Sequence, residues 1–367
     1  MIPHRRGTVA PALLAAALAL LPHPAAAQRW TPQASGTSAS LRGLHVVSPT
    51  VVWASGSRGT VLHTEDGGRT WQVTPVAGAD SLDFRSVHAV DARTAVVASA
   101  GQPARLYRTT DGGRSWTKVY ESPDTAAFFD GLRFWDARRG MVYSDPVNGS
   151  FLVLTTADGG RTWTPVPRAA LPAPLPREAS FAASGSGIVL EPGGRVWIAT
   201  GGGDRARVLR SSDGGRTWQA AETPVVAGRP GAGIFSLAFR DALHGVAVGG
   251  DYQRPKDDSA NVAVTADGGR TWTPAAGRRP AGYRSAVAVV PGTRAGTLVA
   301  VGPTGTDVSV DGGDAWLTAD TVGFNAVGFA SPTAGWAVGE RGRVARWAGV
   351  MPDGQAVRRS RAVDGGR

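Results

Sequence analysis

The sequence contains no cysteine among its 367 residues, and several kinds of chemistry are therefore excluded. Without thiols there can be no disulfide, no cysteine nucleophile, no iron–sulfur cluster and no cysteine-ligated zinc. Lysine is scarce too: Lys118 and Lys256 are the only two, so arginine carries almost all of the positive charge behind the formal net charge of +10. No basic run with interleaved aromatic residues occurs in the body of the chain. We therefore expect no nucleic-acid partner.

Long apolar runs are missing except near the N-terminus. There, "TVAPALLAAALALL" follows the positively charged "MIPHRR" and precedes the small residues Ala25 and Ala27. The run is interrupted by Pro11 and ends at Pro22, so it falls short of the roughly 20 apolar residues of a membrane anchor. This order of charge, apolar core and small residues is typical of a secretory signal peptide. We expect cleavage after Ala27 and export of the protein to the periplasm or the cell exterior.

One short motif, (Ser/Thr)-x-Asp-Gly-Gly-x-(Thr/Ser)-Trp, occurs in five clear copies and one degenerate copy. Its aspartates and tryptophans are Asp66 and Trp71, Asp111 and Trp116, Asp158 and Trp163, Asp213 and Trp218, Asp267 and Trp272, and Asp311 and Trp316. The aspartates are separated by 45, 47, 55, 54 and 44 residues, a spacing that favours the blades of a β-propeller. Six copies cannot all be one active site, so the motif indicates a structural role.

The residue types of the motif suit a tight hairpin. The aspartate can accept hydrogen bonds from nearby backbone N–H groups, the glycines can adopt positive φ, and the tryptophan can pack into the sheet. The alternating acidic ligands of a calcium loop are missing from the motif, so we expect no metal there.

Each interval also contains short strand-like runs, such as "VVWASG" before the first motif. A seventh unit, "GFNAVGFASPTAGWAVGERGRVARWAG", follows the last motif but lacks a fourth strand. "QRWTPQA", Gln28 to Ala34, matches the segments that follow the motifs, although no motif precedes it. We expect it to supply the missing strand and close the ring. The predicted fold is an all-β, seven-bladed propeller with four-stranded blades over residues 28–349, between a signal peptide at 1–27 and a disordered basic tail at 350–367.

These motifs match the BNR or Asp-box repeat. The chain from about Gln28 to Gly349 resembles the photosystem II stability/assembly-factor-like family of seven-bladed propellers, within the sialidase-like and WD40/YVTN-like superfamily. Further stretches carry the resemblance: "SDPVNGSF", "FAASGSG", "GGDYQRPK", "GYRSAVA" and "GWAVGERG". The resemblance implies a non-catalytic scaffold whose partner is a protein or a membrane-complex subunit in the cell envelope.

The alternative is a sialidase-like glycoside hydrolase or another glycan-active enzyme, because Asp boxes also occur in sialidases. Such enzymes use an arginine cluster, a tyrosine nucleophile with a glutamate, and an acid. Tyr143, Tyr252 and Tyr283 have no glutamate beside them in the sequence, and the expected Arg-Ile-Pro signature is missing. His45 and His88 share a register, but no third metal ligand is evident. No dinucleotide fingerprint leads into a helix. We assign no catalytic residue and expect no cofactor or metal.

Alignment of the first strand of each repeat places five polar residues in one register, at the mouth of the central channel: Arg42, Arg85, Asp130, Arg284 and Asn325. Three arginines could converge there on an anionic or glycan ligand, or these could be ordinary solvated residues. Further candidates lie in "SDPVNGS", "PVPRAALPAPLPREAS" and "GGDYQRPKDDSAN", which we expect as long loops on the same face: Asp145, Asn148, Glu178, Asp251 and Tyr252. Such loops often carry recognition. We expect a monomer that binds through this face.

Overall fold

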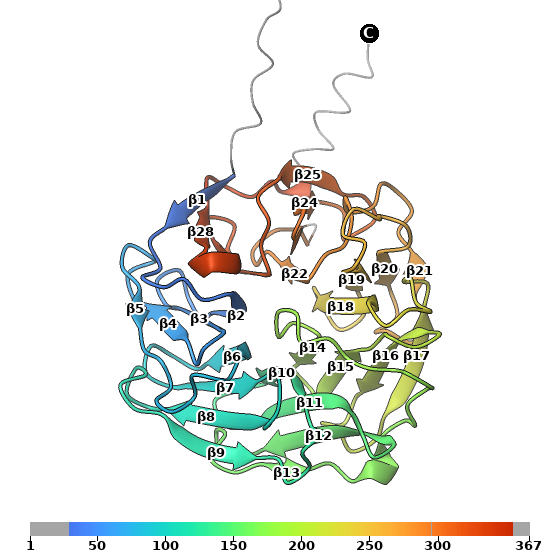
Figure 1. Cartoon of the computed structure of the whole chain (residues 1–367). Coiled ribbons are helices and arrows are strands. Elements are labelled where there is room, and N and C mark those ends of the chain that lie inside the picture. Colours follow the sequence, from blue (N-terminus) through green and yellow to red (C-terminus); the bar gives the residue numbers. More distant parts are fainter. Residues whose placement is uncertain (1–28, 295, 355–367) are drawn as a thin grey trace, which may run out of the picture.

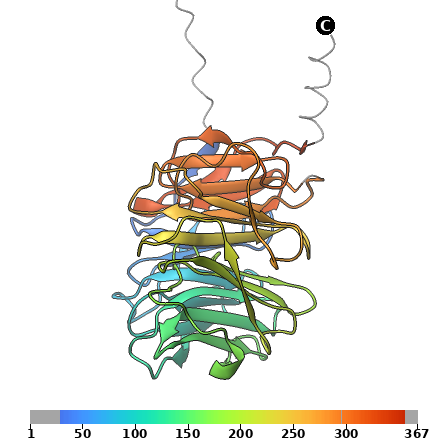
Figure 2. The same ribbon diagram turned by 90° about the vertical axis from the view of Figure 1, so that its right-hand side faces the viewer.

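The structure, a computed structural model, describes residues 29–294 and 296–354. It consists of seven four-stranded antiparallel sheets arranged around a central channel (Figure 1). Seen from the side, the strands of successive blades lie one above another (Figure 2). The predicted seven-bladed propeller is confirmed. The predicted signal peptide lies wholly, and the basic tail largely, outside the described residues.

In the first three blades the innermost strand comes first in sequence. Their strands are β2 (Leu41–Val46), β3 (Val52–Gly56), β4 (Val61–Thr64) and β5 (Gln72–Val73); β6 (Phe84–Ala89), β7 (Ala95–Ser99), β8 (Arg105–Thr109) and β9 (Thr117–Glu121); β10 (Phe129–Phe134), β11 (Gly140–Val147), β12 (Ser150–Thr156) and β13 (Thr164–Pro165). The short 3₁₀ turn η1 (Arg168–Ala170) leads toward the fourth blade.

The next three blades repeat this order, and the last blade joins both ends of the described chain. The strands are β14 (Ile188–Glu191), β15 (Arg195–Ala199), β16 (Ala206–Ser211) and β17 (Gln219–Thr223); β18 (Ala232–Phe239), β19 (Gly245–Asp251), β20 (Val262–Thr265) and β21 (Thr273–Pro274); β22 (Ala286–Val289), β23 (Leu298–Gly302), β24 (Gly305–Ser309) and β25 (Leu317–Asp320); β26 (Ala326–Ser331), β27 (Ala334–Val338), β28 (Val344–Trp347) and β1 (Trp30–Gln33), with η2 at Glu340–Gly342. None of the helical turns in the described residues is long and apolar enough to cross a membrane.

The second strand of a blade is buried on both of its faces. β3, β7, β23 and β27 are buried along their whole length, because neighbouring blades cover both sides of each sheet. These strands are accordingly rich in Val, Ala and Gly and do not alternate apolar with polar residues. The two-residue outer strands β5, β13 and β21 are exposed. The strand-like runs of the sequence thus become the inner layers of the blades.

Buried tryptophans join each blade to the next. Trp53 of the first blade is fully buried; its ring stacks on His63 with centroids 4.4 Å apart. Its Nε1–H donates to the carbonyl of Asp91, in the second blade, at 3.0 Å. A buried indole removes a large apolar area from water and here also satisfies its one polar group. Contacts of this kind hold the ring together without helices.

The ring closes through β1, as the sequence predicts. β1 pairs antiparallel with β28, and Trp30 lies opposite Trp347 in that ladder. Figure 1 shows the blue β1 beside the red β28. Trp30 is buried against Trp347 and Phe324, and its Nε1–H donates to Thr306 Oγ1 of the sixth blade at 2.9 Å. The closing strand therefore contacts two blades at once.

The segment "SDPVNGS" differs from the long loop expected there. β11 extends through Val147 and β12 starts at Ser150, so only Asn148 and Gly149 form the turn. Both residues have positive φ, 51° and 78°, the conformation of a two-residue hairpin turn, which Asn-Gly strongly favours. Residues of this segment are thus held in a sheet, and Asn148 is a turn residue that donates through Nδ2 to Asp124 at 2.6 Å.

The Asp boxes form the hairpins between the third and fourth strands. In the second box, Asp111 Oδ1 accepts hydrogen bonds from Thr109 Oγ1 at 2.8 Å and from the Ser115 N–H at 3.0 Å, and Oδ2 accepts from Ser115 Oγ at 2.6 Å. The Thr109 hydroxyl oxygen also accepts the Gly113 N–H at 3.0 Å. In the degenerate sixth box, Ala315 replaces the Ser or Thr, and only its backbone N–H donates to Asp311. The box aspartate thus organises its own turn.

We expect the boxes to make stability sensitive to acid. The Ser115 hydroxyl and N–H, with Thr109, lower the pKa of Asp111 from 3.8 to about 2; Thr217 does the same for Asp213. A carboxyl whose pKa is lower in the folded state stabilises the fold above the unfolded pKa, and that contribution is lost as pH falls toward the folded value. The urea midpoint should therefore fall between pH 4 and pH 2. An Asp111→Asn variant should show a shallower fall, and an unchanged slope would contradict this role.

Candidate functional site

Four of the innermost strands contain a β-bulge at the same position. The pairing with the second strand shifts register between Leu41 and Gly43, between Phe84 and Ser86, between Phe129 and Gly131, and between Ile234 and Ser236. The extra residue at each bulge is Arg42, Arg85, Asp130 and Phe235. All four line one cavity at the channel mouth. A bulge leaves its extra residue outside the regular ladder and re-aims that side chain, so one device repeated in four blades builds this site.

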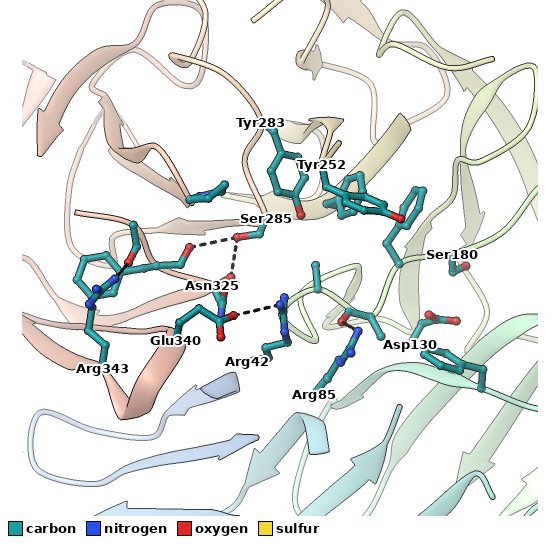
Figure 3. A pocket seen from close by; sticks show the side chains of 18 of the residues that line it. Arg42, Arg85, Asp130, Ser180, Tyr252, Tyr283, Ser285, Asn325, Glu340 and Arg343 are labelled. Atoms are coloured by element: carbon teal, nitrogen blue, oxygen red, sulfur yellow. Dashed lines mark hydrogen bonds and ion pairs between the residues drawn. The ribbon is translucent and has the colours of Figure 1, made fainter. Parts of the chain in front are cut away.

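The cavity, called the mouth cavity below, has a volume of about 700 Å³. Figure 3 shows Arg42 and Arg85 along one edge, Tyr252 and Tyr283 opposite them, and Asp130 with Ser180 at one end. The charged lining residues are Arg42, Arg85, Arg341, Arg343, Asp130, Asp145 and Glu340. No Asp-box residue lies in this lining. The sequence-based register therefore brings Arg42, Arg85, Asp130 and Asn325 together, and the loop candidates Asp145 and Tyr252 join them.

One wall of the mouth cavity is aromatic. Phe181 stacks on Phe235 with ring centroids 3.9 Å apart, and Phe235 meets Tyr283 edge-on at 4.7 Å and Tyr252 at 6.2 Å. Tyr252 remains 50% exposed. Phe235 and Tyr283 are buried. Tyrosine and arginine are among the side chains that most often anchor a protein partner. We call Phe181, Phe235, Tyr252 and Tyr283 the aromatic wall.

The arginines at the opposite edge are held in place by acidic neighbours. Arg42 Nη2 lies 3.2 Å from Glu340 Oε1, which also accepts from Asn325 Nδ2 at 3.1 Å. Arg85 Nε lies 2.7 Å from Asp83 Oδ2. Both guanidinium groups stay partly exposed, so they can still meet a ligand. Exposed ion pairs of this kind contribute little to stability. We infer that Glu340 and Asp83 instead serve to orient the two arginines.

Asp130 is the most unusual group of the cavity. It is 1% exposed, and neither of its carboxyl oxygens has a hydrogen-bond partner within the described residues. Burial, followed by the nearby Asp145 carboxyl, raises the pKa of Asp130 well above its usual range. Asp145 is only partly buried, but this burial raises its pKa as well, although its Oδ1 accepts the Ser180 N–H at 2.6 Å. The end of the cavity thus holds two carboxyl groups, one of them unsatisfied.

Arg284 lies elsewhere than the sequence alignment places it. It is fully buried and pairs with Asp307. Its remaining donors reach the carbonyls of Tyr283 and Ala281 and Thr304 Oγ1. The alignment is displaced by one residue in the sixth blade: the Arg284 N–H donates to the Gly249 carbonyl as the Leu41 N–H donates to the Gly339 carbonyl, so Arg284 holds the buried place of Leu41 and Ser285 lines the cavity. A guanidinium with five N–H groups has none left for a ligand here, and the expected third arginine of the cluster is not available.

Three other candidates lie outside the lining of the mouth cavity. Glu178 is buried, where its Oε1 accepts from Arg207 Nε at 2.9 Å, and Asp251 is buried beside Arg229 at 3.0 Å. Asn148 occupies the β11–β12 turn described above. The structure places all three in contacts within the chain, the first two as acceptors that anchor their loops.

Sequence reasoning found Tyr252 but missed the rest of the aromatic wall, and it missed the charged residues in and after η2. Phe235 occupies the bulge position of the fifth blade in "IFSL", which matches "LRGL" and "FRSV", so the same alignment could have found it. Phe181 precedes the fourth blade, and Arg341 and Arg343 follow β27, where no repeat gives a register. Only folding brings these segments to the mouth.

A sialidase-like hydrolase would need a reactive tyrosine that is paired with an acid. Burial raises the pKa of Tyr143 and of Tyr283, which keeps both as phenols and disfavours a nucleophilic phenolate. Within the described residues, no carboxylate accepts a hydrogen bond from Tyr143, Tyr252 or Tyr283. In the part of the chain that the structure describes, these tyrosines therefore lack the hydrogen-bonded acid that this chemistry uses.

The two histidines lie on the innermost strands β2 and β6, with their rings tilted against each other. The rings of His45 and His88 lie 4.1 Å apart, and His45 Nδ1 accepts the Ala89 N–H at 3.0 Å. Burial lowers the pKa of His45 to about 3 and that of His88 well below its usual value, so both are neutral. The described residues contain no group of three histidine or acidic side chains that could hold a metal ion.

Taken together, these features define the class: a seven-bladed Asp-box β-propeller with an aromatic and arginine-lined mouth. A family model described as photosynthesis system II assembly factor YCF48 matches residues 23–125. This match confirms the resemblance to the photosystem II assembly-factor-like BNR propellers that the motifs indicate. No curated protein sequence matches the chain significantly.

Solved structures support the same fold. "YCF48 bound to D1 peptide" is 17% identical, with a TM-score of 0.62 over 88% of this chain and 97% of that chain. YCF48 from Cyanidioschyzon merolae is 20% identical, with a TM-score of 0.62 over 87% and 98%. The WD40 β-propeller domain of Doa1 is 14% identical, with a TM-score of 0.57 over 88% and 96%. At these identities the likeness establishes the fold.

Proposed function

We propose that this protein is a non-catalytic scaffold that binds a segment of a protein partner in its mouth cavity. The observation that carries the proposal is the cavity of about 700 Å³, in which an aromatic wall faces partly exposed arginines. A cavity of this kind combines the two side-chain types that dominate protein recognition. The solved YCF48 structure that binds a peptide has the same fold, and this supports a peptide segment as the occupant.

We further propose that the protein works in the cell envelope. The support is the N-terminal sequence, whose charged start, apolar run and small residues favour export. The partner would then be an envelope protein or a subunit of a membrane complex. Fractionation of cells that express the full chain, with N-terminal sequencing of the product, tests this: an unprocessed chain in the cytoplasm would contradict it.

The cavity is tested by removing its two bulge arginines. A double variant with Arg42→Gln and Arg85→Gln should bind its partner protein roughly tenfold or more weakly, because both arginines are partly desolvated anchors. The partner is first identified by crosslinking in the cell envelope. Its melting temperature should change little, since exposed ion pairs stabilise weakly. Quantitative crosslinking in the cell envelope, followed by titration of the purified partner, measures the effect.

The matched control lies in the Asp-box hairpins. Arg114 and Arg216 are exposed and occupy the same step of two boxes, so Arg114→Gln with Arg216→Gln makes an identical change of net charge. Recognition in the mouth cavity predicts loss only for the first pair. Equal losses for both pairs, abolished by salt, would mean nonspecific attraction to a basic protein and would refute the proposal.

A further inference from the structure

We propose that the Asp130 end of the mouth cavity binds a primary ammonium group, from a lysine side chain or a free amino terminus, whose carbon chain lies against the aromatic wall. The inference rests on the proposed function insofar as the partner segment carries this group. It goes beyond that function because it specifies the charge of the ligand. The Asp130 end would bind a cationic group, although the edge formed by Arg42 and Arg85 is basic.

The first argument is the unsatisfied acid. Asp130 is buried, lines the cavity, and has two carboxyl oxygens without a hydrogen-bond partner in the described residues. The backbone N–H groups of Asp145 and Ala182 lie close enough to lower its pKa, but neither forms a hydrogen bond of normal geometry with it. A buried polar group without a partner costs stability, so the fold alone gives no reason for an acid at this bulge. A ligand that donates hydrogen bonds would satisfy it.

The second argument is the charge at this end of the cavity. The charged groups that face Asp130 are Asp145, which raises its pKa, and Arg85, which lowers it. Arg85 directs Nε to Asp83 and Nη1 to the Ala182 carbonyl, and it forms no ion pair with Asp130 in the described residues. Two carboxyl groups therefore share one cation that is already engaged by a third. An added ammonium would complement both acids and bring three donors.

The third argument is the apolar surface next to the acids. Ser180 donates its N–H to Asp145, Ala182 faces Asp130, and the residue between them, Phe181, stacks on Phe235. The aromatic wall thus begins within one residue of the acid pair. A cation attached to an apolar chain can use both surfaces, because aromatic faces also attract cations. A carboxylate ligand would instead meet the like charge of the acids.

The test uses small probes with the purified full chain at pH 6.5, where an α-amino group, whose pKa is about 7.7–8.0, is mostly protonated. Phenylalanine amide carries a free α-ammonium, Nα-acetyl-lysine amide carries an ε-ammonium, N-acetyl-phenylalanine amide is neutral, and N-acetyl-phenylalanine is an anion. Titration followed by NMR should show binding of at least one ammonium probe, and which of the two binds identifies the source of the group. Asp130→Asn should weaken that binding about tenfold or more. Asp124→Asn makes the same charge change at a partly exposed acid outside the lining of the mouth cavity and should leave the binding within twofold.

Asp130→Asn should fold at least as stably as the parent, because a carboxyl with a raised pKa destabilises the folded state at neutral pH. If it fails to fold, Asp145→Asn keeps a carbonyl to accept the Ser180 N–H and should still weaken binding severalfold. Equal binding of the neutral amide, tighter binding of the anion, or an affinity unchanged in the acid variants would each overturn the inference. Partner capture could then still depend on Arg42 and Arg85, so the two proposals fail separately.

Discussion

Deletion of residues 29–34 is expected to lower the melting temperature by about 10 °C or more and to make the protein self-associate. These residues contain β1, which completes the seventh blade. The loss of buried Trp30 alone should cost about 3–5 kcal/mol, the range for a large core aromatic changed to alanine. The deletion also removes the β1–β28 ladder and the hydrogen bond from Trp30 to Thr306. An unpaired β28 would present a free strand edge, which promotes association.

Differential scanning calorimetry and size-exclusion chromatography measure the two effects. Deletion of residues 357–367 is the control at the other end of the chain, because that stretch has no alternating apolar pattern to bury. Its melting temperature should match that of the parent. Equal tolerance of both deletions would mean that β1 is not needed to close the ring.

Replacement of Arg284 by leucine should cost about 3–5 kcal/mol of unfolding free energy, the range for breaking a buried ion pair on one side. Asp307 would remain buried as an uncompensated charge, at 1% exposure. Its oxygens would retain only the Ala281 N–H at 3.0 Å and the Thr318 hydroxyl at 2.8 Å. Urea denaturation at pH 7 measures the change.

A double variant with Arg284→Leu and Asp307→Leu separates charge from packing. Because it removes both buried charges, it should recover part of the lost stability. Arg114→Gln, which removes an exposed arginine, should change the unfolding free energy by less than about 0.5 kcal/mol. A single Arg284 variant as stable as the parent would show that Arg284 has no structural role and would return it to the list of binding candidates.

The repeats made the fold predictable. Each Asp box fixes one hairpin, and the match of "QRWTPQA" to the outer strands places the closing strand, because identical local sequences form identical turns and strands. The site was predictable only in part. A repeat alignment reports sequence register, whereas a side chain's direction depends on whether a bulge inserts a residue. Arg85 sits at such a bulge and reaches the cavity, whereas in the sixth blade that place falls to Ser285, and Arg284, one residue earlier, is buried in the core.

The remaining site residues had no signal of that kind. Glu340, Arg341 and Phe181 lie in irregular segments, whose position follows from tertiary packing. The unsatisfied state of Asp130 was also beyond sequence reasoning, since a polar residue at the start of an inner strand reads as solvated until its burial is known. The turn at Asn148, by contrast, could have been predicted, because Asn-Gly strongly favours a two-residue hairpin turn. The long loop expected at this place is therefore a short turn in the structure.

The pairing of β1 with β28 also determines how the ring would respond to tension between the two ends of the propeller. Trp30, at the start of β1, lies opposite Trp347, at the end of β28. A force that pulls these two residues apart would open the antiparallel ladder from one end, and its backbone hydrogen bonds would break one after another, as in a zipper. The other six blades would carry no load until this ladder had opened. A tether at either end of the propeller would therefore find its mechanically weakest point in the seventh blade.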